Sequence, residues 1–95
     1  MPEIDEILEE RGARYGAFTS HAMITQSLKA QVIFDLRARL SRDKVDKSTA
    51  AAIVEGMEMI MHKIGRIANG DPLYLDSWDD IAGYATLVAK AIKGE

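Results

Sequence analysis

The chain has 95 residues, enough for one small domain with a thin hydrophobic core. Cysteine is absent, which excludes disulfides, thiol nucleophiles and zinc–thiolate sites. The formal net charge of −3 argues against a partner bound through its phosphate backbone, such as a nucleic acid. Hydrophobic residues make up 47% of the chain, more than a small monomer easily buries. We therefore predict a single domain over residues 1–95 that forms a homo-oligomer.

The N-terminal segment bears on the cellular location of the protein. It begins Met1-Pro2-Glu3-Ile4-Asp5 and is acidic, without the basic stretch and apolar run of a signal peptide. No apolar segment approaches the roughly 20 residues that a membrane-spanning helix needs. We predict a cytoplasmic protein without a membrane partner.

The first half of the chain carries two helical patterns. Apolar residues with helical spacing predict a short helix over residues 3–11. Two glycines interrupt the pattern, so residues 12–18 are predicted to form an irregular connection. A second helix is expected to begin at an N-cap, Thr19 or Ser20, and to run to Leu40. A charged loop follows it.

The second half predicts two further helices. Ser48 or Thr49 is the expected N-cap of the third helix, and Gly70 ends it. Asp76 or Ser77 is the expected N-cap of the fourth. The third helix is predicted to bury a wide apolar face that contains Ile53, Met57, Ile60, Met61, Ile64, Ile67 and Ala68.

No stretch alternates with the period of two that is typical of strands. The predicted fold is therefore all-α: a compact antiparallel helical bundle with one short N-terminal helix and three longer helices.

Acidic side chains at the third and fourth helices form the first candidate site. Glu55 and Glu58 lie three residues apart and share one surface of their helix. Asp76 and Asp79 have a sufficient structural role at a helix start, whereas Asp80 has less of one. Carboxylates from two neighbouring helices can hold magnesium, and magnesium can position a triphosphate for attack by water. Under this hypothesis they point into a shared hollow, and the metal ligands are Glu55, Glu58, Asp76 and Asp80.

A structural alternative exists for the acidic residues of the third helix. At about 100° per residue, one polar strip runs along the side opposite the apolar face. Such a strip is also the ordinary solvated side of an amphipathic helix. Its members are Glu55, Glu58, His62, Arg66 and Asn69. On spacing alone, both interpretations stay open.

A second candidate site combines arginine with aromatic residues. Arginine pairs with phosphate, and aromatic rings stack on nucleobases. A turn with core aromatics and surface arginines would explain the N-terminal members equally well. The candidate ligand-binding residues are Arg11, Arg14, Tyr15, Phe18, Lys63, Arg66, Trp78 and Tyr84.

Three motifs resemble a family of small bacteriophage and prophage helical proteins. They are Arg11-Gly12-x-x-Tyr15-Gly16-x-Phe18, Lys63-x-x-Arg66-Ile67, and Asp76-Ser77-Trp78-x-Asp80-Ile81-Ala82-Gly83-Tyr84-Ala85. The resemblance covers about residues 8–88. More distantly, the pattern is similar to MazG-like all-α nucleotide pyrophosphohydrolases and to phage nucleotide-modification-associated domains. That similarity implies that the protein binds magnesium and acts on a nucleoside triphosphate.

The acidic pattern departs from the MazG-like one. Asp76 replaces the first glutamate of the second acidic pair, and the second helix offers only Asp35 for a further pair. Three functions are therefore considered. One is binding of a nucleotide or nucleotide-like phosphate, with magnesium-dependent pyrophosphohydrolase-like activity. The alternative is a non-catalytic counter-defence protein, in the host cytoplasm if phage-encoded, that sequesters a host signalling nucleotide or docks on a host protein. An assembly role limited to self-association is a third.

Overall fold

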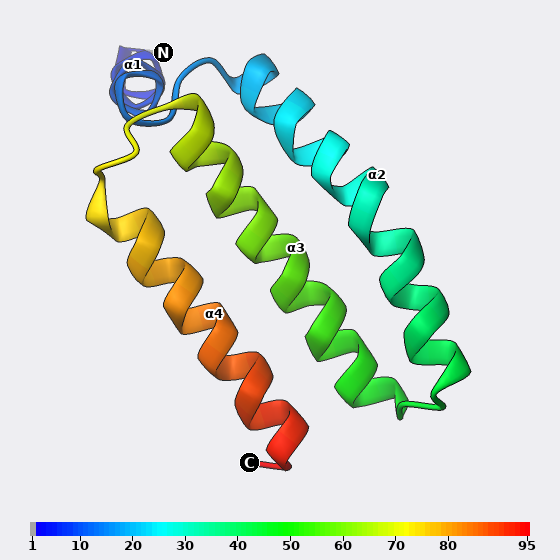
Figure 1. The fold of residues 1–95 in the computed structure, drawn as a ribbon. Helices are drawn as coiled ribbons and strands as arrows, with labels where there is room; N and C mark the ends of the chain where they lie inside the picture. The colour runs from blue at the N-terminus through cyan, green and yellow to red at the C-terminus, as the bar shows by residue number, and fades with distance from the viewer. Residues whose placement is uncertain (1) are drawn as a thin grey trace.

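The computed structural model describes residues 2–95 and contains four helices joined by short connections (Figure 1). No strand occurs in this range, so the predicted all-α fold of one shorter and three longer helices is confirmed. The helices are α1 Pro2–Tyr15, α2 Phe18–Arg42, α3 Lys47–Asn69 and α4 Leu75–Lys93.

The first helix is longer than predicted. It continues through Gly12 to Tyr15, because a glycine within a helix costs only about 1 kcal/mol relative to alanine. The break occurs instead at Gly16, whose φ of 78° lies in the left-handed region that favours glycine. The predicted irregular connection over residues 12–18 is therefore reduced to Gly16 and Ala17.

The predicted N-caps are wrong for the three longer helices. Asp46 caps α3, where its carboxylate accepts a hydrogen bond from the Thr49 backbone N–H at 3.0 Å. This bond is the largest cause that lowers the pKa of Asp46 to about 2. Helices α2 and α4 begin after Ala17 and Tyr74, and neither residue makes a side-chain cap. Both residues are instead bonded to other helices: the Asn69 amide donates to the Ala17 carbonyl, and Arg14 donates to the Tyr74 hydroxyl.

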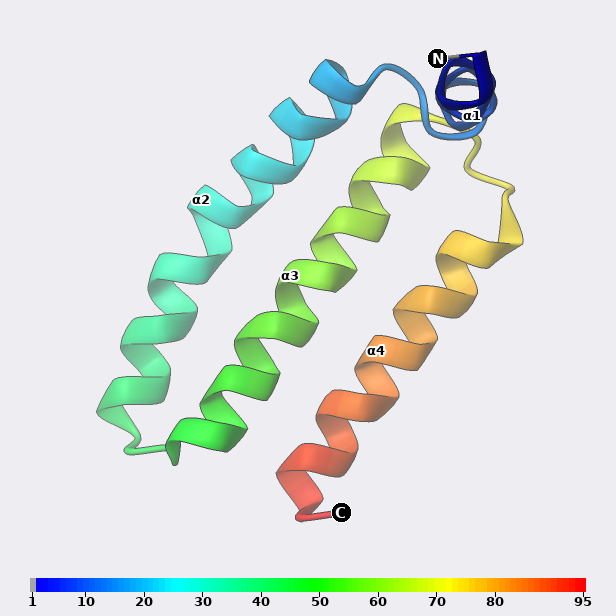
Figure 2. The ribbon, with the colours of Figure 1, turned by 180° about the vertical axis from the view of Figure 1, so that it is seen from behind.

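Helices α2, α3 and α4 form a single antiparallel layer with α3 in the middle (Figures 1 and 2). Within residues 2–95, α2 and α4 make no contact with each other, and α4 contacts only α3. Helix α1 lies across the end of the layer where α3 finishes, and is seen nearly end-on in both views. The molecule is correspondingly elongated, with principal extents of 48 × 27 × 27 Å.

Glycines allow α3 to approach both of its neighbours closely. A Cβ on Gly65 would lie 2.6 Å from the Thr25 hydroxyl of α2. A Cβ on Gly56, on the other side of α3, would overlap the Val88 side chain of α4. At about 100° per residue these two glycines point in opposite directions. The flanking helices therefore sit on opposite sides of α3, which leaves its two remaining sides uncovered by either one.

The predicted apolar face of α3 is largely one of these uncovered sides. Ile64 is 39% exposed, and only Val54 and Met61 are buried hydrophobic residues in the described chain. Both are placed toward α2. We call the side of the layer that carries Ile53, Met57, Ile60, Ile64 and Ile67 the open face; none of these five is buried. The predicted face is therefore only partly buried within one chain: Met61 is buried, Ile64 is exposed, and the other large side chains are half-buried.

Helix α1 stands on the opposite side of the layer, which we call the α1 face. The Asn69 side-chain amide, at the end of α3, donates hydrogen bonds of 2.9 Å to the carbonyls of Tyr15 and Ala17. Gly70 packs directly against the backbone of Arg14 and Tyr15, where no Cβ would fit. The Asp71 N–H also donates to the Arg14 carbonyl, at 2.7 Å. These contacts fix the end of α1 against the end of α3.

A search of the four helices for a bilayer-spanning segment finds none among residues 2–95.

Candidate ligand-binding pocket

A pocket of about 470 Å³ opens on the α1 face, between α1, the start of α2 and the last turns of α3. Its size falls in the range of small-molecule sites, roughly 300–1,000 Å³. We call it the arginine–aromatic pocket. It is lined by Leu8, Arg11, Gly12, Tyr15, Gly16, Ala17, Phe18, His21, His62 and Arg66.

Four of the predicted ligand-binding residues meet in this pocket: Arg11, Tyr15, Phe18 and Arg66. They come from three helices. The Arg66 guanidinium lies 4.2 Å from the centre of the Tyr15 ring, a cation–π distance that holds both side chains in place. Phe18 is 78% exposed, so its ring remains available to a ligand at the rim. The N-terminal segment and the polar strip of α3 thus contribute to one site.

Two histidines form the inner wall of the pocket. The Nε2 atom of His21 lies 3.3 Å from the Nδ1 atom of His62, and the Thr25 hydroxyl lies 3.4 Å from the same Nε2 atom. His21 is 6% exposed, and its Nδ1 atom has no hydrogen-bond partner among the described residues. The rings meet edge to face, with centroids 4.6 Å apart.

Both histidines are held in the neutral form at pH 7. Burial is the largest cause that lowers the pKa of His62 to about 4, and the positive charge of Arg66 adds to it. Burial also lowers the pKa of His21 and outweighs the opposite effect of the Gly65 backbone. The positive charge of the pocket therefore comes from Arg11 and Arg66. The two neutral imidazoles carry no charge and contribute only hydrogen-bond donors and acceptors.

The other four predicted ligand-binding residues lie outside the pocket. Arg14 forms an ion pair with Glu10 at 2.8 Å and donates to the Tyr74 hydroxyl at 3.0 Å. The Trp78 indole donates to the Pro72 carbonyl at 2.8 Å. These groups support the connections between helices. The two remaining members, Lys63 and Tyr84, lie between α3 and α4, where Lys63 is buried and Tyr84 is half-buried.

The four predicted metal ligands do not gather in one place. Glu58 pairs with Lys29 of α2 at 3.4 Å, whereas Asp80 pairs with Lys63 at 3.0 Å. Asp76 is exposed in the first turn of α4. Within residues 2–95, no three acidic or histidine side chains form a group that could hold a metal ion. The fold does not bring these four carboxylates together, and the magnesium site stays a prediction without support from the described residues.

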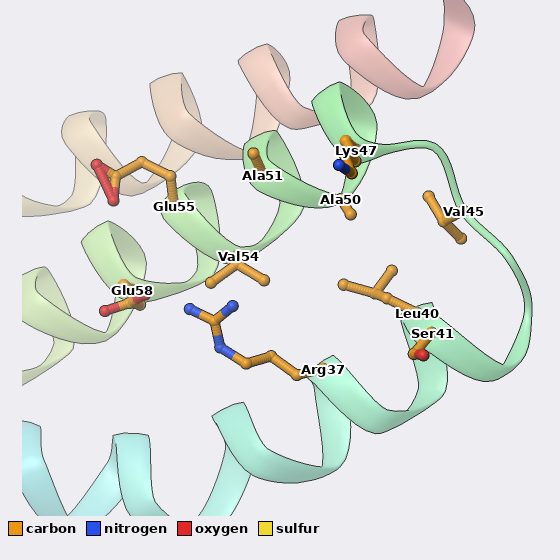
Figure 3. Close-up of a pocket in the computed structure, with 10 residues that line it drawn as sticks. All are labelled: Arg37, Leu40, Ser41, Val45, Lys47, Ala50, Ala51, Val54, Glu55 and Glu58. Atoms are coloured by element: carbon orange, nitrogen blue, oxygen red, sulfur yellow. The ribbon is translucent and has the colours of Figure 1, made fainter.

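Glu55 and Glu58 instead line a second pocket, of about 550 Å³, between α2 and α3 at the opposite end of the layer (Figure 3). Arg37 extends from α2 toward Val54 and Glu58, and Leu40 and Val45 close the loop end. Asp80 is not among its lining residues, so this pocket does not join Glu55 to Asp80. The polar strip of α3 therefore serves two separate pockets and the α1 junction.

His21 and His62 were not predicted as site residues. In the sequence, His62 is explained as a member of the polar strip of the third helix. A signal was nevertheless present, since His62 precedes Arg66 by one helical turn and His21 follows Phe18 by three residues. What the sequence does not show is that α2 and α3 bring the two imidazoles into contact.

No family model, curated protein or solved structure matches the chain. The resemblance to phage helical proteins and to MazG-like enzymes therefore stays a prediction from the motifs.

Proposed function

We propose that the arginine–aromatic pocket binds a small anion that carries an aromatic ring, of the class of nucleoside phosphates. The observation that supports this is the meeting of Arg11 and Arg66 with Tyr15 and Phe18 around one pocket of about 470 Å³. Guanidinium groups recognise phosphate oxygens through paired charge-assisted hydrogen bonds. Aromatic side chains supply a stacking surface that accepts any base.

The charge of the pocket favours an anion over a cation. No carboxylate is present among its lining residues, and both arginines are positively charged. The charge of Arg66 also lowers the pKa of both histidines. A bound phosphate would offset the positive charge of the two arginines. The pocket is thus matched to a ligand with negative charge at one end and a planar apolar group at the other.

Binding without turnover is the form of this function that the geometry favours. Hydrolysis of a triphosphate by the MazG-like route needs carboxylates that share a metal, whereas Glu58 and Asp80 are each paired with a lysine. A protein that binds but does not cleave would act by sequestering its ligand. This corresponds to the counter-defence alternative that the motif resemblance implies.

The binding proposal is tested by calorimetric titration with nucleoside monophosphates, the matching nucleosides and inorganic phosphate, all in the presence of EDTA. A nucleoside monophosphate should bind more tightly than either fragment. Arg66→Gln should weaken its binding about tenfold, equivalent to about 1.4 kcal/mol, because one charge-assisted contact is lost. Arg39→Gln is the matched control, since Arg39 is exposed and lines neither pocket.

Equal losses in Arg66→Gln and Arg39→Gln would show that attraction is non-specific, and binding of none of these probes would exclude this ligand class. Turnover is tested separately with magnesium and nucleoside triphosphates. No pyrophosphate should be released; its release would favour the enzymatic alternative and require a different set of metal ligands.

A further inference from the structure

We infer that two copies of this chain associate through their open faces. The inference does not depend on the proposed ligand, because the arginine–aromatic pocket lies on the α1 face, on the other side of the layer. It goes beyond the sequence-based expectation of an oligomer because it names the surface and places α3 of each copy at its centre.

The open face is apolar along the whole of α3. Five large apolar side chains follow one another there at helical spacing, and each is half-buried or exposed: Ile53, Met57, Ile60, Ile64 and Ile67. The opposite side of α3 carries Glu55, His62 and Arg66. This asymmetry is larger than solvation of a monomer requires, since a helix exposed on two sides would ordinarily be polar on both.

Helix α4 extends the same apolar surface. Ser77 and Val88 are directed toward α3, and Trp78 and Ile92 lie on the flank of α4 opposite Leu87. Because α3 and α4 are antiparallel right-handed helices, that flank belongs to the open face. Trp78 is 51% exposed and Ile92 is 61% exposed. A contiguous apolar patch built from two helices is typical of a protein–protein contact.

The solvent-accessible area of the chain is larger than that of a typical monomer of its mass, as expected for a subunit of a dimer. The chain exposes 6773 Å². A folded monomer of 10.5 kDa is expected to expose about 5,400 Å², so the excess is about 1,300 Å². A standard interface buries about 800 Å² per partner, and obligate homodimers bury more. The excess is therefore of the size that one partner buries in an obligate homodimer.

A second copy is the occupant that this surface fits. A two-fold axis brings the same patch of each chain together, so an apolar patch needs no complementary charge pattern to match itself. Pairing two open layers face to face also supplies the second layer that a helical domain needs to enclose a core. Helix α1 does not obstruct the approach, because it stands on the other side of the layer (Figure 2).

The first test measures the mass of the full chain by sedimentation equilibrium. The wild type should have the mass of two chains, and Ile64→Glu should have the mass of one, because a buried charge would face the partner. Leu87→Glu is the matched control. Leu87 is likewise exposed, at 62%, but lies on the other flank of α4. It should remain a dimer. A monomeric wild type, or dissociation by Leu87→Glu with a dimeric Ile64→Glu, overturns the proposal.

A second test holds even if Ile64→Glu fails to fold, as circular dichroism would show. The chain has no cysteine, so Ile60→Cys and Leu87→Cys each introduce one unique thiol. A short bis-maleimide should link two chains of Ile60→Cys in high yield and leave Leu87→Cys largely unlinked. The reverse pattern, or equal yields, would place the interface elsewhere.

Discussion

The two uncovered sides of α3 differ in what they are made of and in how they are used. The α1 face carries charged and imidazole side chains, of which Arg66 lies against Tyr15 and His62 against His21. The open face carries apolar side chains that residues 2–95 leave half-buried or exposed. Polar groups half-buried in a small protein need partners close by, whereas apolar groups need only area. One helix therefore provides a specific pocket on one side and an unspecific apolar patch on the other.

The largest expected effect is the difference in unfolding free energy between truncation of a buried and of an exposed side chain of α3. Met61→Ala should lower the free energy of unfolding by about 2–5 kcal/mol, because Met61 is 3% exposed. Ile64→Ala should cost only about 1 kcal/mol at dilutions where the chain is monomeric, because Ile64 is 39% exposed. Urea unfolding at several protein concentrations measures both. Equal losses at every concentration would contradict the assignment of Ile64 to an uncovered side.

A smaller loss is expected where α1 joins the α1 face. Gly70→Ala should cost about 1–3 kcal/mol, because the new Cβ overlaps backbone atoms of Arg14 and Tyr15 that cannot rotate away. It should also weaken nucleotide binding by displacing α1. Gly12→Ala is the control: nothing lies within 4 Å of its Cβ position, and the change should be neutral or stabilising. A Gly70→Ala variant with unchanged stability and binding would show that α1 is not docked in this way.

The ion pairs on the two flanks of α3 provide a comparison of smaller size. Asp80→Asn should cost about 1 kcal/mol, because it leaves the Lys63 ammonium, with a side chain 11% exposed, without its partner. Glu58→Gln should cost less, since its pair with Lys29 is longer and the lysine more exposed. Neither should alter nucleotide binding. A magnesium-dependent loss of binding in Asp80→Asn would restore the metal hypothesis for this residue.

The last predicted difference is the response of the α1 face to pH. The pKa of His62 is about 4 in the folded chain and 6.5 when unfolded, so the unfolded chain takes up a proton first as the pH falls. Stability should therefore decrease between pH 7.5 and pH 6 and continue to fall toward pH 4. The urea midpoint of the wild type should follow this trend, and that of His62→Gln should fall less. Identical slopes would show that His62 is not held neutral by the fold.

The helices and the candidate residues of the pocket could be predicted from the sequence, but their arrangement could not. Periodicity located four helices, because amphipathic spacing is a local property. It could not tell that the stripe through Ile64 faces outward, since burial depends on where α2 and α4 pack. The neighbouring helices pack closely at Gly56 and Gly65. An isolated glycine in a helical pattern does not indicate which helix will pack against it.

The candidate sites show the same division. Arg11, Tyr15, Phe18 and Arg66 were selected for their chemistry, and the fold unites them. The acidic residues were selected by spacing within each helix. Their separation reflects two ion pairs that form only in the folded chain. Lys29 of α2 pairs with Glu58 of α3, and Lys63 of α3 pairs with Asp80 of α4. Pairs distant in sequence are beyond any local pattern.

The absence of any α2–α4 contact within residues 2–95 has a consequence for how the molecule transmits change. The outer helices influence each other mainly through the helix that both touch, as neighbouring units do in a linear array; the one other link runs through α1, which contacts α2 and bonds to Tyr74 before α4. Substitutions on the outer edges of α2 and α4 should therefore be energetically independent, and a double-mutant cycle between Phe34 and Leu87 should give a coupling energy near zero. A substitution that displaces α3 should affect the packing of every other helix, because α3 contacts all three. The cooperativity of unfolding should therefore depend mainly on this one helix.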